Sequence, residues 1–403
     1  MKKIFFILAT FILLISSLVP SVATAQNTIQ VIDSSASVFF PSALTFNIEA
    51  ENAVPITKIR LHYYSDRLNY AHVISEAWPV FTPNQKVKTD WIWDMRRSSL
   101  PVGATIRYWW TIEDANGNKL VTPENSIQFD DSRFQWKKLS ENGILLFWYK
   151  GDDAFAKELM DAAQKGLERL SKDTGATLKT TAKLYIYGST EDLQSAMLFP
   201  RGWEGGFAAY EYGTINIGIS TQEIAWGKKA IAHELGHLVT HQITFSPYGD
   251  LLPVWLDEGL AMHAEGQIDP SDRKLIDRAI SMNALISLRS LASPFSTDAS
   301  KAALSYAQSQ SVVEFLISTY GREQMAKLLH LFYEGSTIDD ALQKIYGVDQ
   351  DGLNTIWLAS ISSPATITRA PDQGAQVMTE MPLYQSEDMQ GYRQNPTYRL
   401  YRH

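Results

Sequence analysis

Two histidines and a glutamate lie close together in residues 230–239, where the sequence reads H-E-x-x-H inside an apolar run. On a helix, His233 and His237 are one turn apart, offset by about 40° and about 6 Å along the axis, so both imidazoles can reach one metal ion. Glu234 then lies about 100° round from His233, beside that ion. Two imidazoles that bind a metal and a carboxylate that accepts a proton from water form the reactive core of a zinc hydrolase. The spacing therefore predicts His233 and His237 as zinc ligands and Glu234 as the general base.

A catalytic zinc site needs a third protein ligand, with the fourth position left for water. The chain has no cysteine, so this ligand is expected to be a histidine or a carboxylate. Position 243, six residues after His237, is isoleucine and supplies no third histidine. Glu258 is the better candidate, because it lies on a predicted second helix that begins near Pro253 and can fold back on the first. Its neighbour Asp257 is a rival ligand.

The residues 255–261, W-L-D-E-G-L-A, follow the H-E-x-x-H motif by about twenty positions. This combination resembles the gluzincin pattern of zinc metallopeptidases, and most closely the peptidase MA-like group, over about residues 134–362. The resemblance implies one Zn²⁺ per chain held by His233, His237 and Glu258, with a peptide or protein as substrate. It also implies an antiparallel edge strand above the site, which residues 205–219 would supply. The exopeptidase motif G-x-M-E-N is not present in the sequence, so aminopeptidase specificity is not inferred.

The mechanism that the resemblance implies is attack of a water on a peptide carbonyl. Zinc lowers the pKa of its water to about 7, and Glu234 takes the proton and passes it to the leaving amine. Zinc and one further donor would stabilise the oxyanion. Tyr306 is the candidate donor because the family often places a tyrosine downstream of the glutamate ligand, although a packed helix aromatic explains Tyr306 equally well.

Several residues around these ligands have predicted supporting roles. Asp257 and Glu265 are possible acceptors for the ring N–H groups of the two histidines. His241 is one more turn along the helix and is expected to face solvent, with a role near the ligands or the substrate as the alternative. His263 and His330 are expected on helix surfaces. Gly259 costs helix stability and suggests that two helices approach closely there.

The composition indicates a globular, exported protein. Of the 403 residues, 45% are hydrophobic and 20% are charged, and the net charge of −8 argues against nucleic acid as a partner. Lys2 and Lys3, an apolar run to Val19 and a small-x-small site at 23–25 predict a signal peptide over 1–25. We expect a secreted or extracytoplasmic bacterial protein with no membrane span in the mature chain. The oligomeric state does not follow from the sequence.

The rest of the chain predicts a multidomain protein. Residues 26–132 contain short alternating runs separated by turn residues, which is typical of an all-β immunoglobulin- or fibronectin-like sandwich. Core packing is the favoured role for its aromatic residues, over a sugar-binding face. Residues 133–362 predict an α+β zincin-like metallopeptidase domain whose C-terminal half is helical, with helices over 271–292, 301–320, 321–333 and 337–345. Residues 363–403 predict a poorly ordered tail.

Two other functions remain open on the sequence alone. The chain can be a surface protein that binds a partner or glycan through its sandwich, with a weak or inert protease domain. It can also be a zinc hydrolase that cleaves a non-peptide amide, for example in a cell-wall component. Retention of Glu234 and all three candidate ligands favours the active peptidase.

Overall fold

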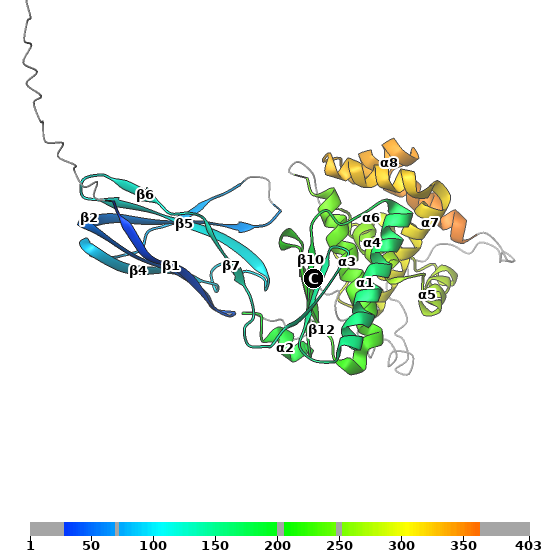
Figure 1. Cartoon of the computed structure of the whole chain (residues 1–403). Coiled ribbons are helices and arrows are strands. Elements are labelled where there is room, and N and C mark those ends of the chain that lie inside the picture. The colour runs from blue at the N-terminus through cyan, green and yellow to red at the C-terminus, as the bar shows by residue number, and fades with distance from the viewer. Residues whose placement is uncertain (1–27, 69–71, 200–204, 247–251, 363–403) are drawn as a thin grey trace, which may run out of the picture.

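The computed structural model describes residues 28–68, 72–199, 205–246 and 252–362. The predicted signal peptide and tail lie outside these residues. Figure 1 shows an N-terminal β-rich part at one end of the molecule and a helical part at the other. A second sheet lies between them. No helix in the described ranges is long and apolar enough to cross a membrane.

The N-terminal part is one curled sheet built around a long strand, β2, which spans Ala43–Asp66. The first half of β2 pairs with β1 and β4, and its second half pairs with β3 and β5. Strands β6 and β7 pair with β5. The other strands are β1 (Gln30–Phe39), β3 (Ser75–Ala77), β4 (Asn84–Asp94), β5 (Ala104–Asp114), β6 (Lys119–Val121) and β7 (Asn125–Phe129). The all-β prediction holds, while the immunoglobulin- or fibronectin-like assignment stays a prediction.

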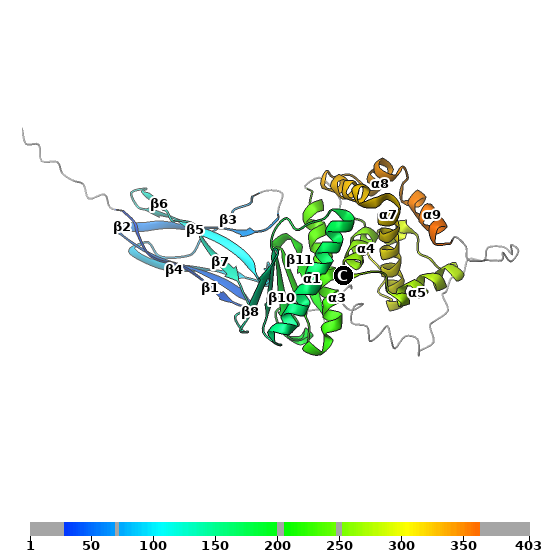
Figure 2. The ribbon, with the colours of Figure 1, turned by 45° about the vertical axis from the view of Figure 1, so that its right-hand side comes forward.

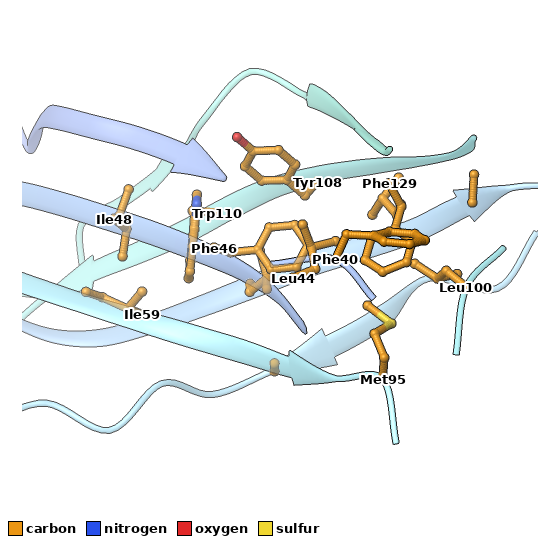
Figure 3. Packing of buried hydrophobic residues seen from close by; sticks show 14 of the residues in the cluster. Phe40, Leu44, Phe46, Ile48, Ile59, Met95, Leu100, Tyr108, Trp110 and Phe129 are labelled. Atoms are coloured by element: carbon orange, nitrogen blue, oxygen red, sulfur yellow. The ribbon is translucent and has the colours of Figure 1, made fainter. Parts of the chain in front are cut away.

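Aromatic and aliphatic side chains fill the inside of this curled sheet (Figure 3). Phe46 and Trp110 are fully buried, and the Tyr108 ring packs edge-on against Phe46 with centroids 5.0 Å apart. Core packing is therefore the role of Tyr108 and Trp110. Trp109, which alternates with them along β5, faces the other way and stacks on His62 with centroids 5.1 Å apart.

The second sheet has five strands in the order β11-β12-β10-β9-β8. The three inner strands are parallel, and the two outer strands run antiparallel to their neighbours. Strand β11 is an antiparallel edge strand and lies within residues 205–219, where the resemblance implies one. The strands are β8 (Lys137–Glu141), β9 (Ile144–Trp148), β10 (Ala182–Tyr187), β11 (Gly206–Ala209) and β12 (Thr214–Gly218).

Strand β10 has a different hydrophobic core on each face. Leu184 and Ile186 join the core under the helices. Tyr185 and Tyr187 alternate with them and join the core of the N-terminal β part. The Tyr185 hydroxyl donates to Asp130 Oδ1 at 3.1 Å. The two parts of the protein therefore share a continuous apolar contact through one strand.

Helices cover one face of the second sheet and extend beyond it, as the turned view in Figure 2 shows. The motif helix α3 spans Ile224–Thr244, and α4 spans Val254–Glu265. The remaining helices are α1 (Asp153–Thr174), α2 (Thr190–Gln194), α5 (Pro270–Ser281), α6 (Leu288–Leu291), α7 (Ala299–Tyr333), α8 (Ile338–Tyr346) and α9 (Gln350–Ile361), with short 3-10 turns η1 (Tyr210–Tyr212) and η2 (Thr221–Glu223). The predicted helix 271–292 is two helices, α5 and α6. The predicted helices 301–320 and 321–333 form the two segments of α7, which are separated by a kink at the non-helical residue Gly321.

Candidate metal centre

Two glycines allow the helices that carry the candidate site to pack at close range. A Cβ on Gly236 of α3 would lie 2.8 Å from the Cα of Ala261 on α4. A Cβ on Gly259 of α4 would lie 2.5 Å from the carbonyl oxygen of Ser309 on α7. Both contacts are closer than side-chain carbon atoms tolerate, so glycine is required at each crossing. The predicted close approach at Gly259 is confirmed, and the helix that it meets is α7.

This packing brings three candidate ligands together in a buried group. The Nε2 atoms of His233 and His237 lie 3.1 Å apart. Glu258 Oε2 lies 3.3 Å from each of these two nitrogens. All three residues are buried, with exposed fractions of 0%, 3% and 4% in sequence order. The structure thus places the three residues in the arrangement expected from the sequence.

A carboxylate contacts the outer nitrogen of each histidine. His233 Nδ1 lies 2.8 Å from Glu265 Oε1, and His237 Nδ1 lies 3.0 Å from Asp257 Oδ1. These contacts confirm the acceptor positions predicted for Glu265 and Asp257. They fix the ring orientations and leave the two Nε2 atoms directed at Glu258. Asp257 Oδ2 also lies 3.3 Å from His241 Nε2, so the His241 ring is held in this network and is only partly exposed.

The geometry of the triad fits a tetrahedral zinc ion. Ligand atoms about 2.1 Å from a tetrahedral ion are about 3.4 Å apart, close to the separations observed here. Glu258 Oε2 is buried and has no hydrogen-bond partner, despite its short distances to the two histidines. An unsatisfied buried carboxylate oxygen is costly unless a cation completes its environment. His237, His241 and Asp257 form a second possible metal-binding group, but there Asp257 is already occupied by the two imidazoles.

The carboxylates and imidazoles of this group stabilise one another in their charged forms. Burial would raise the pKa of Glu258, but the charges of the two histidines outweigh it and lower that pKa to about 2. Burial would likewise lower the pKa of His237, but Asp257 and Glu258 raise it well above its ordinary value. The pKa of Asp257 lies well below its ordinary value, because His237 and His241 outweigh its burial. Without a metal, protons on the imidazoles therefore balance the charge of the carboxylates, and a cation bound between the ligands would take the place of those protons.

The other predicted site residues have different surroundings. Glu234 is on α3 next to His233 and is 6% exposed. Tyr306 lies on α7 in a small apolar cluster with Ala230 and Met262, and its ring packs edge-on against Phe295 with centroids 5.1 Å apart. These surroundings agree with the packed-aromatic interpretation of Tyr306, and its role as a donor stays a prediction.

One expectation about a histidine is wrong. His263 is buried, 8% exposed, and its Nε2 atom lies 3.1 Å from Asp173 Oδ2. It faces inward because α4 lies between α1, α3 and α7 and has little free surface. His330, also predicted on a surface, is exposed and contacts Glu334.

Tyr210 also lies near the site, although the sequence does not predict it there. Its ring stacks on His241 with centroids 4.3 Å apart and lies 6.1 Å from the ring of His237. It belongs to the short turn η1, directly after the edge strand β11. The only signals for it in the sequence are the glycines on either side of this segment, Gly205, Gly206 and Gly213.

Comparisons with known proteins identify the family of the chain. A family model described as the Peptidase MA superfamily matches residues 162–363, half of the chain. No curated protein matches the sequence.

Among solved structures, the chain is similar to an aminopeptidase A from Legionella pneumophila at 9% identity and a TM-score of 0.35, over 82% of this chain and 50% of that protein. It is similar to OgpA from Akkermansia muciniphila at 12% identity and a TM-score of 0.21, over 26% of this chain and 28% of OgpA. A polysaccharide deacetylase from Bacillus cereus gives 12% identity and a TM-score of 0.19, over 42% of this chain and 54% of that protein. The chain spans about half or less of these three proteins, and the scores are too low to define a common fold.

Proposed function

The chain belongs to the Peptidase MA superfamily, and from this premise we propose that it is a zinc-dependent metallopeptidase that hydrolyses peptide bonds. The observation that carries the proposal is the buried triangle of His233, His237 and Glu258 with an unsatisfied carboxylate oxygen at one corner. A buried donor set of two imidazoles and one carboxylate, free of thiolates, is that of a catalytic zinc site.

Different residues of the site have different roles in the proposed hydrolysis. Zinc bound by the triad would supply Lewis-acid chemistry, which polarises a peptide carbonyl and makes a water more acidic. Glu234 takes the proton from the attacking water and delivers it to the nitrogen of the leaving amine. Glu265 and Asp257 hold the two imidazoles in the tautomer whose Nε2 lone pair is available. The edge strand β11 can pair with an extended substrate, as exposed sheet edges do.

The test combines metal content with proteolysis. The purified chain is expected to hold one zinc, measured by mass spectrometry, and to release peptides from casein. Glu234→Gln keeps the zinc and loses at least about a hundredfold in kcat, the usual contribution of a general base. Glu223→Gln, a change of the same chemistry at an exposed residue just before α3, is the matched control and keeps full activity.

The outcomes separate the alternatives. Zinc without casein hydrolysis, but with release of an amine from a cell-wall amide that also needs Glu234, would identify a non-peptide amidase. Zinc with neither activity would favour a binding protein that uses its N-terminal β part. Absence of bound zinc after reconstitution would overturn the proposal that the chain is a zinc metallopeptidase.

We also propose that the chain is exported, on the basis of the basic, apolar and small-residue sequence of 1–25. N-terminal sequencing of the protein recovered outside the cytoplasm is expected to begin at Gln26. Recovery with Met1 in the cytoplasm would contradict this proposal without affecting the metal site.

A further inference from the structure

The turn η1 brings a tyrosine close to the candidate metal centre. Tyr210 stacks on His241, with ring planes 8° apart. His241 in turn contacts Asp257, which contacts His237. The Tyr210 ring is thus fixed with respect to a ligand through two rigid contacts, at 6.1 Å from the His237 ring.

The hydroxyl of Tyr210 is close enough to the charged part of the site to interact electrostatically with three of its carboxylates. Burial raises the pKa of Tyr210 well above its ordinary value, and the negative charges of Glu234, Asp257 and Glu258 raise it further. The group therefore remains a neutral O–H donor throughout the physiological range. In the described part of the chain, nothing accepts a hydrogen bond from this hydroxyl, so the donor is available to a bound molecule.

The N-terminal β part holds the other side of the same turn. The Arg67 guanidinium lies 2.9 Å from Glu211 Oε2. The backbone N–H of Leu68 donates to the carbonyl oxygen of Glu211 at 2.7 Å. Arg67 also lies over the Tyr212 ring, 6.0 Å from its centroid. Since Tyr210 packs on α3 and Glu211 is tied to the end of β2, the turn is fixed from two sides before any substrate binds.

We propose that the hydroxyl of Tyr210 donates a hydrogen bond to the oxyanion formed when a peptide carbonyl is attacked in this site. The inference rests on the proposed peptidase function and assigns one of its catalytic residues. It replaces Tyr306, whose ring is 2% exposed and packs on Phe295. A donor fixed in advance and aimed where charge develops is the arrangement that lowers the barrier to acyl transfer.

Tyr210 acts when the carbonyl oxygen becomes negative. The water oxygen forms a bond to the carbonyl carbon, and the π electron pair of the C=O bond moves to the carbonyl oxygen. Glu234 takes the proton that the water loses. Tyr210 keeps its own proton and only donates a hydrogen bond to the negative oxygen. When the C–N bond breaks, the electron pair on oxygen re-forms the C=O bond and the proton on Glu234 passes to the departing nitrogen.

The test is Tyr210→Phe, which keeps the stacked ring and removes only the hydroxyl. We expect kcat for a peptide substrate to fall about 10²- to 10³-fold, the usual loss for one oxyanion donor. KM and zinc content stay unchanged. The affinity for a phosphinic peptide, a stable analogue of the tetrahedral state, falls by a similar factor. Tyr212→Phe, two residues along the same turn with its ring toward Arg67, is the matched control and keeps wild-type values.

The possible outcomes test the role of Tyr210 separately from the proposed peptidase activity. If the wild type cleaves peptides, Glu234→Gln does not, and Tyr210→Phe retains kcat and phosphinate affinity within twofold, Tyr210 is not the donor and the peptidase stands. A rise in KM with kcat unchanged would make Tyr210 a residue that only binds the substrate, and it would also overturn the inference. If the wild type neither cleaves peptides nor binds the phosphinate, the peptidase and the role of Tyr210 fail together.

Discussion

Asp257 and Glu258 are adjacent in the sequence, yet their carboxylates approach opposite nitrogens of one imidazole, that of His237. Asp257 Oδ1 lies 3.0 Å from Nδ1, and Glu258 Oε2 lies 3.3 Å from Nε2. Neighbouring positions on a helix point about 100° apart, which lets them reach around the two sides of the ring. The two acids therefore differ in role: one faces the proposed metal, and the other orients the ligand.

This difference predicts unequal effects on metal affinity. Glu258→Gln replaces the ligand oxygen and is expected to abolish stoichiometric zinc. Asp257→Asn leaves the triad intact and is expected to weaken zinc about 10- to 100-fold, the usual cost of losing a carboxylate behind a histidine ligand. Competition with a chromogenic chelator measures both affinities. Equal losses in the two variants would contradict the separate roles.

Zinc binding should release protons, and the release should depend on Asp257. Without metal, the neighbouring carboxylates outweigh burial and hold the pKa values of His233 and His237 above the ordinary value, so zinc must displace protons wherever the pH lies below these raised values. Affinity therefore rises with pH until the two histidines have lost their protons. Calorimetry in buffers of different ionisation enthalpy counts the protons. Asp257→Asn removes a cause of the raised pKa of His237 and should lower the count.

The same shifts give the sign of the pH effect on metal-free stability. The charged histidines contribute stability that is complete below about pH 6.5 and is lost as pH rises through their raised pKa values. Glu258, with its pKa lowered to about 2, contributes stability that is present above about pH 4.5 and is lost on acidification. The metal-free protein should gain most from this cluster between these limits. Thermal melts after chelation would contradict this if the contribution of the cluster, taken as the difference from Glu258→Gln, were independent of pH.

Gly259→Ala tests the helix crossing that positions Glu258. Alanine favours a helix by about 1 kcal/mol over glycine, but its Cβ would lie 2.5 Å from the carbonyl oxygen of Ser309. We expect the cost of overpacking to exceed the gain in helix propensity. The net loss should be about 1–3 kcal/mol in the free energy of unfolding, with weaker zinc binding. Lys274→Ala, on the exposed side of α5, is a control for substitution in a helix and should change little. A stabilised Gly259→Ala variant would mean that the helices separate easily.

Tyr185 tests whether the N-terminal β part and the peptidase part unfold together. Its ring is 2% exposed, stacks on Phe147 at 4.6 Å and packs edge-on to Trp136 at 5.4 Å. Tyr185→Ala should cost about 3 kcal/mol, whereas Tyr185→Phe, which loses only the hydrogen bonds with Asp130 and Gln128, should cost about 1 kcal/mol. Calorimetry should show one transition for the wild type. Two well-separated transitions, or equal effects of the two variants, would show that this interface does not couple the parts.

The ligand triad could be predicted because its residues lie in short sequence motifs. H-E-x-x-H sets two ligands by helical periodicity, and the acidic helix after Pro253 narrows the third to Asp257 or Glu258. The choice between those two, and the contacts of Glu265, depend on helix crossings at Gly236 and Gly259 that spacing only suggests. His263 was misjudged because periodicity identifies one buried face, and α4 is covered on more than one.

The remaining features depend on contacts between distant segments. A proline usually ends or interrupts a strand, but β2 continues through Pro55, with an irregularity in its pairing with β4 between Glu51 and Ile56. Tyr210 was missed because a three-residue turn has no periodicity. Its position follows only from tertiary contacts with His241 and the end of β2.

The edge strand β11 is only four residues long. Backbone pairing along so short an edge accepts a polypeptide that is already stretched out, and it rejects a helix or a folded loop, whose own amide groups are engaged. A compact protein would therefore become a substrate only while part of it is transiently unfolded. Its rate of digestion would then follow its local opening equilibrium and not its abundance of suitable bonds. An enzyme of the proposed kind would then discriminate unfolded chains from native ones without recognising a particular sequence.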